Sequence, residues 1–330
     1  MGLRMGRSLL FGVTASVVSL GIALLTAEFA LRASGNSPSG TDRGNRWTMK
    51  PDDGFFVYSQ RRGYAYGPGR FTVDFESGHR FSITHDDDGL RATPDAGGAP
   101  EVWIFGGSFT HGWSVDDDET FPWVLGDLLD STQVRNFGVG GYGTLLSLIQ
   151  LEEALEQRAA PETVVLAYAS FHDERNVWTR SWRRAIAPAD PEAGHPIPRA
   201  RYASGGFEVV REVPRHRPFP LEHRSALMHQ LGDKAGRIEN RLRLRSREVT
   251  EAILLAMRNL CEEAGTRFLV AGILDNEATR RRLTFCADAG IDTVDISVDL
   301  DAGLRNLPHD EHPGPAAHAI YARRLAGVLR

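Results

Sequence analysis

The run TVVLAYA at residues 163–169 is apolar at almost every position, which is typical of a strand buried on both faces of a parallel sheet. Further short runs with strand character lie at 102–105, 133–137, 268–271 and 293–296. Helix-like stretches separate these runs along the chain. Such alternation predicts an α/β fold in which helices cover both faces of a parallel sheet.

Helical periodicity marks the stretches between these runs. Leucines recur every three or four residues from 145 to 155, so they share one face of a helix. Further helices are expected at about 120–129, 246–264, 277–289 and 316–329. The first of these has Pro122 in its opening turn, and Asp117 or Asp118 is its expected cap.

The N-terminal region is apolar in a different way. Residues 8–27 carry no charge, and roughly 20 such residues suffice to cross a bilayer core of about 30 Å. Arg4 and Arg7 precede this run and Glu28 follows it, which places the N-terminus in the cytoplasm. We expect a single-pass anchor in the cell inner membrane, with the rest of the chain on the periplasmic or extracellular side. A cleaved signal peptide and a buried core helix are the alternatives.

Composition divides the chain into three regions. Residues 1–33 are the predicted anchor, and 34–98 combine a Gly- and Ser-rich tether with a small β-rich extension of short alternating runs. Residues 99–330 form the predicted main domain. The stretch at about 170–229 interrupts its rhythm with many arginines and prolines, so we interpret it as an insertion.

Charge and cysteine content exclude several classes of function. The net charge of −5 and the lack of a long basic run do not fit nucleic-acid binding. The two cysteines, Cys261 and Cys286, form neither a disulfide framework nor a metal motif, and we expect unpaired, buried thiols. We expect no cofactor and no metal, although two histidines beside acidic residues near the C-terminus leave a metal site as an alternative.

Ligands of open parallel sheets bind at the C-terminal ends of the strands, so functional residues are expected in the loops that follow the strands. The first such loop reads GGSFTHG, at residues 106–112. Its two glycines allow a tight turn that presents Ser108 as a nucleophile, with its amide near a developing oxyanion. A Gly-rich turn with a capping serine is the alternative. A phosphate-binding loop lacks support because its lysine is missing.

The second loop, NFGVGGYGT at 136–144, contains four glycines. Bare amides at these positions can face a negative oxygen, or the glycines can serve close packing alone. The spacing does not match the GxGxxG pattern of dinucleotide-binding loops.

The third loop, PHDEHP at 308–313, precedes the last predicted helix. His312 can act as a general base for Ser108, and Asp310 can hold its ring in one tautomer. A metal site and a solvated polar turn are the alternatives at this point.

In this order, the three loops resemble the conserved blocks of the SGNH (GDSL-like) hydrolase family over residues 101–330. The resemblance implies a flavodoxin-like three-layer α/β/α fold. It also implies Ser108 as nucleophile, Gly141 as the donor of an oxyanion-hole amide, and the pair Asp310 and His312 as acid and base.

One position departs from the family pattern. The family has an asparagine after the third strand, and its amide completes the oxyanion hole. The sequence AYASFHDERN places His172 at that position and Asp173 in register. An imidazole N–H can also donate to an oxyanion, so we expect His172 to replace the asparagine, with Asn176 as the second candidate.

These features together predict an esterase. It would cleave acyl or acetyl esters of an extracytoplasmic substrate, such as an acylated glycan, through a Ser-His-Asp acyl-enzyme mechanism. Two alternatives use the same fold: an O-acyltransferase acting on a cell-envelope glycan, and a catalytically silent binding protein. The expected partners are this substrate and the membrane, through the N-terminal helix.

Overall fold

The computed structural model describes residues 2–40, 46–97, 100–129, 131–188, 192 and 194–330. It divides into two compact units, which we describe separately. One comprises Met1–Gly44 with His216–Glu239, and the other comprises Asn45–Arg215 with Asn240–Arg330. The predicted boundary at 98–99 and part of the predicted tether, 41–45, lie outside the described residues.

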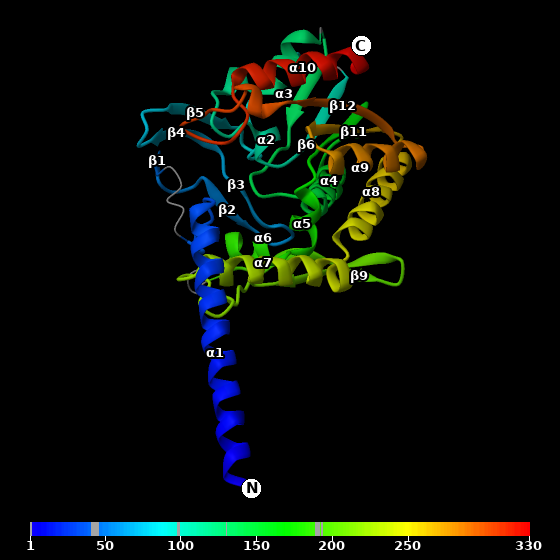
Figure 1. The fold of residues 1–330 in the computed structure, drawn as a ribbon. Coiled ribbons are helices and arrows are strands. Elements are labelled where there is room, and N and C mark those ends of the chain that lie inside the picture. The colour runs from blue at the N-terminus through cyan, green and yellow to red at the C-terminus, as the bar shows by residue number, and fades with distance from the viewer. Residues whose placement is uncertain (1, 41–45, 98–99, 130, 189–191, 193) are drawn as a thin grey trace. The chain divides into compact units, whose positions relative to one another are not determined.

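A five-stranded parallel sheet forms the centre of the larger unit (Figure 1). Its strands are β6 (Glu101–Gly106), β7 (Gln133–Asn136), β8 (Thr163–Tyr168), β11 (Arg267–Leu274) and β12 (Asp292–Val298). They lie in the order β7-β6-β8-β11-β12. Numbered along the chain, this is the 2-1-3-4-5 order of flavodoxin-like folds. The predicted fold class is therefore confirmed.

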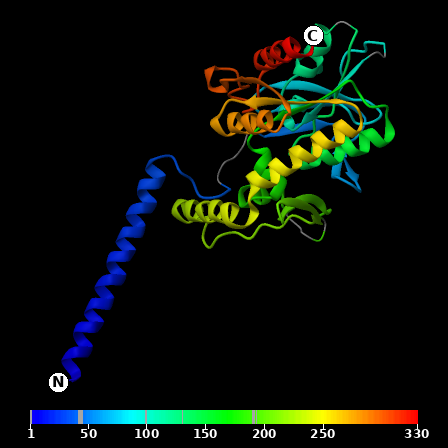
Figure 2. The same cartoon turned by 90° about the vertical axis from the view of Figure 1, so that its right-hand side faces the viewer.

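Helices cover both faces of this sheet, as Figures 1 and 2 show. One face carries α3 (Phe121–Leu128) and α10 (Pro315–Leu329). The other carries α4 (Thr144–Gln157), α8 (Ser246–Glu263) and α9 (Glu277–Asp288). Successive strand residues point to opposite faces, so Ile104 of β6 packs in the first core and Trp103 in the second. Cys261 and Cys286 are buried and unpaired, as expected.

The start of α3 differs from the prediction. Thr120 is the cap, and its Oγ1 accepts a hydrogen bond from the amide of Trp123 at 3.3 Å. Asp117 and Asp118 belong instead to a preceding 3-10 turn, η1 (Asp117–Glu119). Asp117 is unavailable as a cap because its carboxylate binds groups of the β-rich extension.

Residues of the predicted β-rich extension form two small antiparallel arrangements in the larger unit. Strands β1 (Trp47–Lys50), β4 (Gly69–Phe75) and β5 (Arg80–His85) form one sheet. Strands β2 (Phe56–Ser59) and β3 (Gly63–Tyr66) form a hairpin. Arg91 connects the extension to the main sheet, because its backbone bridges His85 at the end of β5 and Asn136 at the end of β7.

The Arg91 side chain is buried at this junction and makes several polar contacts. Its Nε lies 2.6 Å from Asp117 Oδ1. Its Nη2 donates to the carbonyl oxygens of Ser82 (3.0 Å) and Val115 (2.9 Å), and Nη1 donates to that of Gly112 (3.1 Å). A single cation thus joins the extension to the segment that follows residues 108–111.

The predicted insertion contains more regular structure than its sequence indicates. It includes α5 (His172–Val177), α6 (Arg180–Ile186) and a hairpin of β9 (Ile197–Ala203) and β10 (Gly206–Glu212). Helix α7 (Ala226–Glu239) follows and leads into a π-helical turn, η2 (Asn240–Leu244).

The smaller unit contains α1 (Gly2–Ala33) and α7. Residues Leu9–Ala33 are long and apolar enough to cross a membrane, as an anchor or a signal sequence. Their side chains are not buried, so the alternative of a buried core helix is wrong. Glu28 of α1 accepts hydrogen bonds from the amides of Ala226 and Leu227 and from the Ser225 hydroxyl, which caps the start of α7.

The Arg91 junction yields a stability prediction. Replacing Arg91 with methionine keeps most of the side chain's volume but removes the cation that pairs with Asp117 and donates to four carbonyl groups. Removing one partner of a buried ion pair costs about 3–5 kcal/mol, so the free energy of unfolding should fall by that amount. Urea unfolding of the full chain in detergent measures it.

Arg80→Met is the matched control. Arg80 also pairs with an aspartate, Asp74, but on the surface, so its loss should leave the unfolding midpoint nearly unchanged. Equal destabilisation by the two substitutions would contradict the role of the junction.

Candidate active site

Ser108 lies at the end of β6 and begins a single helical turn, α2 (Ser108–His111). Gly106 precedes it where the backbone leaves the sheet. A Cβ at Gly106 would lie 2.2 Å from Thr110 Oγ1 and 3.0 Å from the carbonyl oxygen of Ala167. Only glycine therefore fits this turn, which directs Ser108 to the C-terminal edge of the sheet.

The structure brings Ser108, His312 and Asp310 together in a line. His312 Nε2 lies 2.9 Å from Ser108 Oγ, and its Nδ1 lies 2.5 Å from Asp310 Oδ1. A carboxylate can only accept a hydrogen bond, so the ring proton belongs on Nδ1. Nε2 is then free to accept the proton of the Ser108 hydroxyl, as a general base must.

The Asp310 carboxylate is held in its ionised form. Burial raises the pKa of Asp310, but hydrogen bonds from the ring and the backbone amide of His312 lower it by more. The pKa therefore lies below its ordinary value. The backbone N–H of His312 donates to Asp310 Oδ1 at 2.7 Å. Asp310 thus positions both the ring and the backbone of His312.

The loop that carries the base is fastened to the loop that follows the serine. Asn306 is the connection: its amide N–H donates to the carbonyl oxygen of His312 at 3.0 Å, and its side-chain Nδ2 donates to that of Ser114 at 2.5 Å. Arg305 Nη1 also donates to the carbonyl oxygen of Glu311 at 3.0 Å. The Ser108 to His312 distance therefore depends on backbone contacts as well as on the side chains themselves.

The glycine-rich loop of residues 136–143 packs directly beside the nucleophile. The amide of Val139 donates to the carbonyl oxygen of Gly106 at 3.0 Å. Gly141 has a φ of +84°, and a Cβ there would lie 2.5 Å from Tyr64 Oη. Both conformation and space require glycine at the position predicted to supply an oxyanion-hole amide.

The β-rich extension holds this loop in place. Tyr64 Oη donates to the carbonyl oxygen of Gly140 at 3.0 Å, and the Gly140 amide donates to Tyr66 Oη at 2.8 Å. Burial raises the pKa of Tyr66, so its hydroxyl stays protonated. Residues of the extension thus fix both backbone polar groups of Gly140, the residue before Gly141, a role that their sequence does not indicate.

His172 also lies beside the loop that carries Ser108. A Cβ placed on Gly107 would lie 3.5 Å from His172 Nε2. Burial, together with the nearby Arg175 charge, lowers the pKa of His172 well below its ordinary value, so the ring is neutral and carries one N–H. Its Nδ1 is buried and has no hydrogen-bond partner among the described residues. A proton on Nε2, toward Gly107, therefore breaks no existing bond.

The second donor candidate, Asn176, is committed elsewhere. Its Oδ1 accepts a hydrogen bond from the amide of Leu145 at 2.9 Å, and its Nδ2 donates to Thr250 Oγ1 at 2.8 Å. Asp173 is also turned away, because it accepts from the Tyr168 hydroxyl and pairs with Arg282. These two residues anchor α5 to its neighbours, which leaves His172 as the donor candidate from that segment.

Other histidines near the serine have structural partners. His111 Nε2 lies 2.9 Å from Nε2 of His85, and burial lowers the pKa of His111 well below its ordinary value. His318 Nδ1 accepts a hydrogen bond from the amide of Phe121 at 3.0 Å, and burial lowers its pKa to about 3. Both are therefore neutral groups of the core and poor alternatives to His312.

Arg175 and Trp182 also reach this region, and of the two the sequence patterns do not single out Arg175. Arg175 Nη1 would lie 2.8 Å from a Cβ on Gly107, and the Trp182 ring would lie 3.7 Å from a Cβ on Gly141. A signal for Arg175 exists in the sequence: it follows His172 by three residues, the spacing that puts two side chains on one face of a helical turn.

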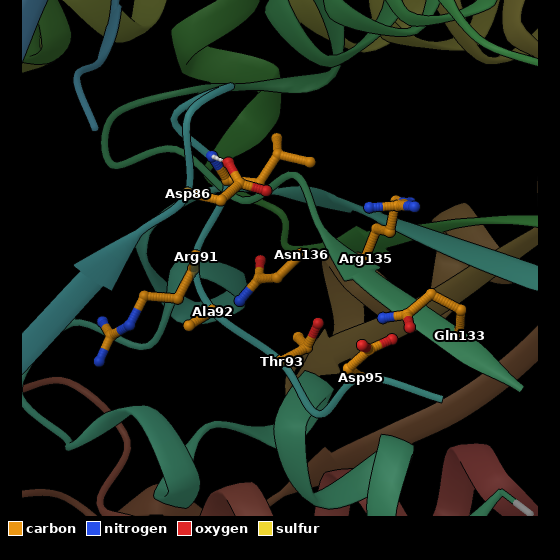
Figure 3. A pocket seen from close by; sticks show the side chains of 9 residues that line it. Asp86, Arg91, Ala92, Thr93, Asp95, Gln133, Arg135 and Asn136 are labelled. Atoms are coloured by element: carbon orange, nitrogen blue, oxygen red, sulfur yellow. Dashed lines mark hydrogen bonds between the residues drawn. The ribbon is translucent and has the colours of Figure 1, made fainter. Parts of the chain in front are cut away.

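A separate pocket of about 260 Å³ lies beside the Arg91 junction. Figure 3 shows its polar lining, which includes Asp86, Asp95 and Arg135. Neither Ser108 nor His312 lines it, so this pocket is distinct from the candidate site. Within the described residues, no cluster of three or more His, Cys, Asp or Glu side chains is arranged to hold a metal ion.

Comparisons with known proteins found matches among solved structures alone. No family model and no curated protein matches the sequence. A member of the lipolytic protein G-D-S-L family from Veillonella parvula is 10% identical, with a TM-score of 0.42, over 70% of this chain and 98% of that one. A GDSL-like lipase from Bacteroides thetaiotaomicron is 11% identical, with a TM-score of 0.35, over 72% of this chain and 91% of that one. The chain resembles GDSL-family lipolytic proteins in structure.

Gly141 provides a test of the loop geometry. Gly141→Ala places a Cβ against Tyr64 Oη and forces a left-handed conformation, so the loop should shift and ester hydrolysis should fall by about 10²–10³, as for loss of one oxyanion donor. The measurement is the kcat for p-nitrophenyl acetate.

The double variant Gly141→Ala with Tyr64→Phe removes the clashing oxygen. Part of the lost activity should return, while Tyr64→Phe alone should cost less than Gly141→Ala. Wild-type activity in Gly141→Ala would contradict the placement of this amide.

Proposed function

We propose that the chain is a serine ester hydrolase in which Ser108 forms an acyl-enzyme. The observation that carries this proposal is the line of Ser108, His312 and Asp310, with distances of 2.9 and 2.5 Å between successive polar atoms. A serine that donates to a histidine, which in turn donates to an ionised carboxylate, is the arrangement that activates a hydroxyl for attack on a carbonyl carbon.

In the first half of the proposed reaction, Ser108 Oγ attacks the ester carbonyl and His312 Nε2 takes its proton. The carbonyl oxygen becomes an oxyanion, which the amides of Ser108 and Gly141 and the His172 N–H stabilise. The tetrahedral intermediate collapses when the C–O bond to the alcohol breaks. The departing alkoxide takes the proton from His312, and the acyl group remains on Ser108.

In the second half, water gives a proton to His312 and attacks the acyl carbon. The Ser108–acyl bond breaks, Ser108 recovers its proton from His312, and the acid is released. An acceptor alcohol in place of water would give an O-acyltransferase with the same residues. We propose an extracytoplasmic ester as substrate, and support comes from α1, whose flanking charges favour an orientation with the larger unit outside.

The nucleophile is tested with a fluorophosphonate probe, which reacts with activated serines. Wild type should be labelled and should hydrolyse p-nitrophenyl acetate, whereas Ser108→Ala should lose both properties and remain folded by circular dichroism. Ser204→Ala, in the exposed turn between β9 and β10, is the control and should behave as wild type. A wild-type chain that is neither labelled nor active would favour the silent binding protein.

Variants at His172 test the oxyanion hole. His172→Ala removes the donor and should lower kcat by about 10²–10³. His172→Asn supplies an amide donor and should retain more activity than the alanine variant. The pKa of His172 lies well below its ordinary value, so one uncharged donor replaces another, and the pH profile of kcat/KM should keep its shape in His172→Asn. Wild-type kcat in His172→Ala would exclude His172 from this role.

A further inference from the structure

Arg175 is a cation placed beside the candidate nucleophile. It lies one helical turn after His172 on α5, and its Nη1 would come within 2.8 Å of a Cβ on Gly107, the residue before Ser108. The same Nη1 donates to the carbonyl oxygen of Tyr142 in the glycine-rich loop at 2.9 Å. The guanidinium is therefore fixed between the serine loop and the loop of Gly141.

Two aromatic rings set the orientation of this group. The Arg175 guanidinium carbon lies 4.2 Å from the ring centroid of Phe171 and 4.7 Å from that of Trp182. Contacts of this length between a guanidinium and aromatic faces are attractive, and they hold the planar group by its faces. Its edges remain for hydrogen bonds. None of the Arg175 nitrogens is both buried and without a hydrogen-bond partner.

The charge of Arg175 has no carboxylate partner in the part of the chain that the structure describes. The adjacent Glu174 is engaged elsewhere, because its Oε2 accepts from the hydroxyls of Thr179 and Ser181. The partly buried Arg62 and the buried Arg282, by contrast, both pair with acidic side chains. Burial lowers the pKa of Arg175 to about 10, which still leaves it cationic near neutral pH.

An unpaired cation that is partly removed from water destabilises a fold. A neutral amide could make the bond to the Tyr142 carbonyl without that cost. An anion that reaches the guanidinium would offset that cost. An ester bound at Ser108 would pass close to Arg175, since Gly107 separates the two.

We propose that Arg175 binds a negatively charged group, a carboxylate or a phosphate, that the ester substrate carries close to its scissile carbonyl. This inference rests on the proposed function and names its substrate class: anionic esters. A guanidinium edge matches the paired oxygens of both anions. The Trp182 ring extends from Arg175 toward Gly141 and gives the uncharged part of such a substrate an apolar surface to pack against.

Two esters of equal length test the proposal on the full chain in detergent. Mono-4-nitrophenyl adipate carries a carboxylate, and its methyl ester is neutral. Wild type should prefer the anionic ester in kcat/KM, and Arg175→Met should lower the anionic-to-neutral ratio by about 10- to 100-fold, the range for hydrogen bonds to charged groups. Arg175→Lys should retain part of the preference, because it keeps the charge but loses the planar edge.

Arg247→Met is the control, since Arg247 is an exposed cation that pairs with Glu251 on α8, and its ratio should equal that of wild type. Inhibition by free adipate and by inorganic phosphate shows whether Arg175 prefers a carboxylate or a phosphate. The anion that inhibits wild type more strongly should no longer inhibit Arg175→Met. Equal losses on both esters in Arg175→Met would overturn the proposal, because Arg175 would then act on the oxyanion or on the loop alone.

Failure of the proposed function has a different signature. A wild-type chain that hydrolyses neither ester and is not labelled at Ser108 contradicts the esterase. Adipate and phosphate binding measured by calorimetry then still decides the role of Arg175. Binding by wild type and not by Arg175→Met supports an anion site, and absence of binding to wild type excludes it.

Discussion

The buried guanidinium of Arg91 is the interaction on which the arrangement of the site depends. It donates to a carbonyl of the extension and to two carbonyls of the segment that follows α2, and it pairs with Asp117. Separating the extension from the main sheet would break the bonds from Arg91 to Asp117, Gly112 and Val115. The extension is therefore part of the site's framework, and through Tyr64 and Tyr66 it also fixes the loop of Gly141.

His312 and His172 lie in different environments, which suit them to different chemical roles. His312 has the ionised Asp310 at Nδ1, which orients the ring and can stabilise the positive charge that forms when it takes a proton. His172 has no carboxylate partner and is buried beside a cation, so it remains neutral. The first environment suits a base, and the second suits a donor whose charge does not change during turnover.

Much of the fold and part of the site follow from local sequence patterns. The apolar run of residues 163–169 and the glycines around Ser108 determine the conformation of their own segments. These segments are therefore predictable from local sequence. The contacts of Tyr64 and Tyr66 join residues far apart in the chain, and no local pattern encodes them. Asn176 looks like a free donor in sequence, but burial obliges its amide to bond to Leu145 and Thr250. The place of Arg175 in the site is harder to predict, because isolated charged residues are usually solvated.

Because Glu28 caps α7, removal of the apolar helix by a protease would also alter the smaller unit. The acceptor for the first amides of α7 is almost 200 residues away in the chain, on the last turns of the apolar helix. A protease that cut just beyond Ala33 would release this carboxylate with the leader. The mature chain would then have to rebuild the beginning of α7 with water as the acceptor. Retention of the leader and the integrity of the smaller unit are thus linked by one side chain.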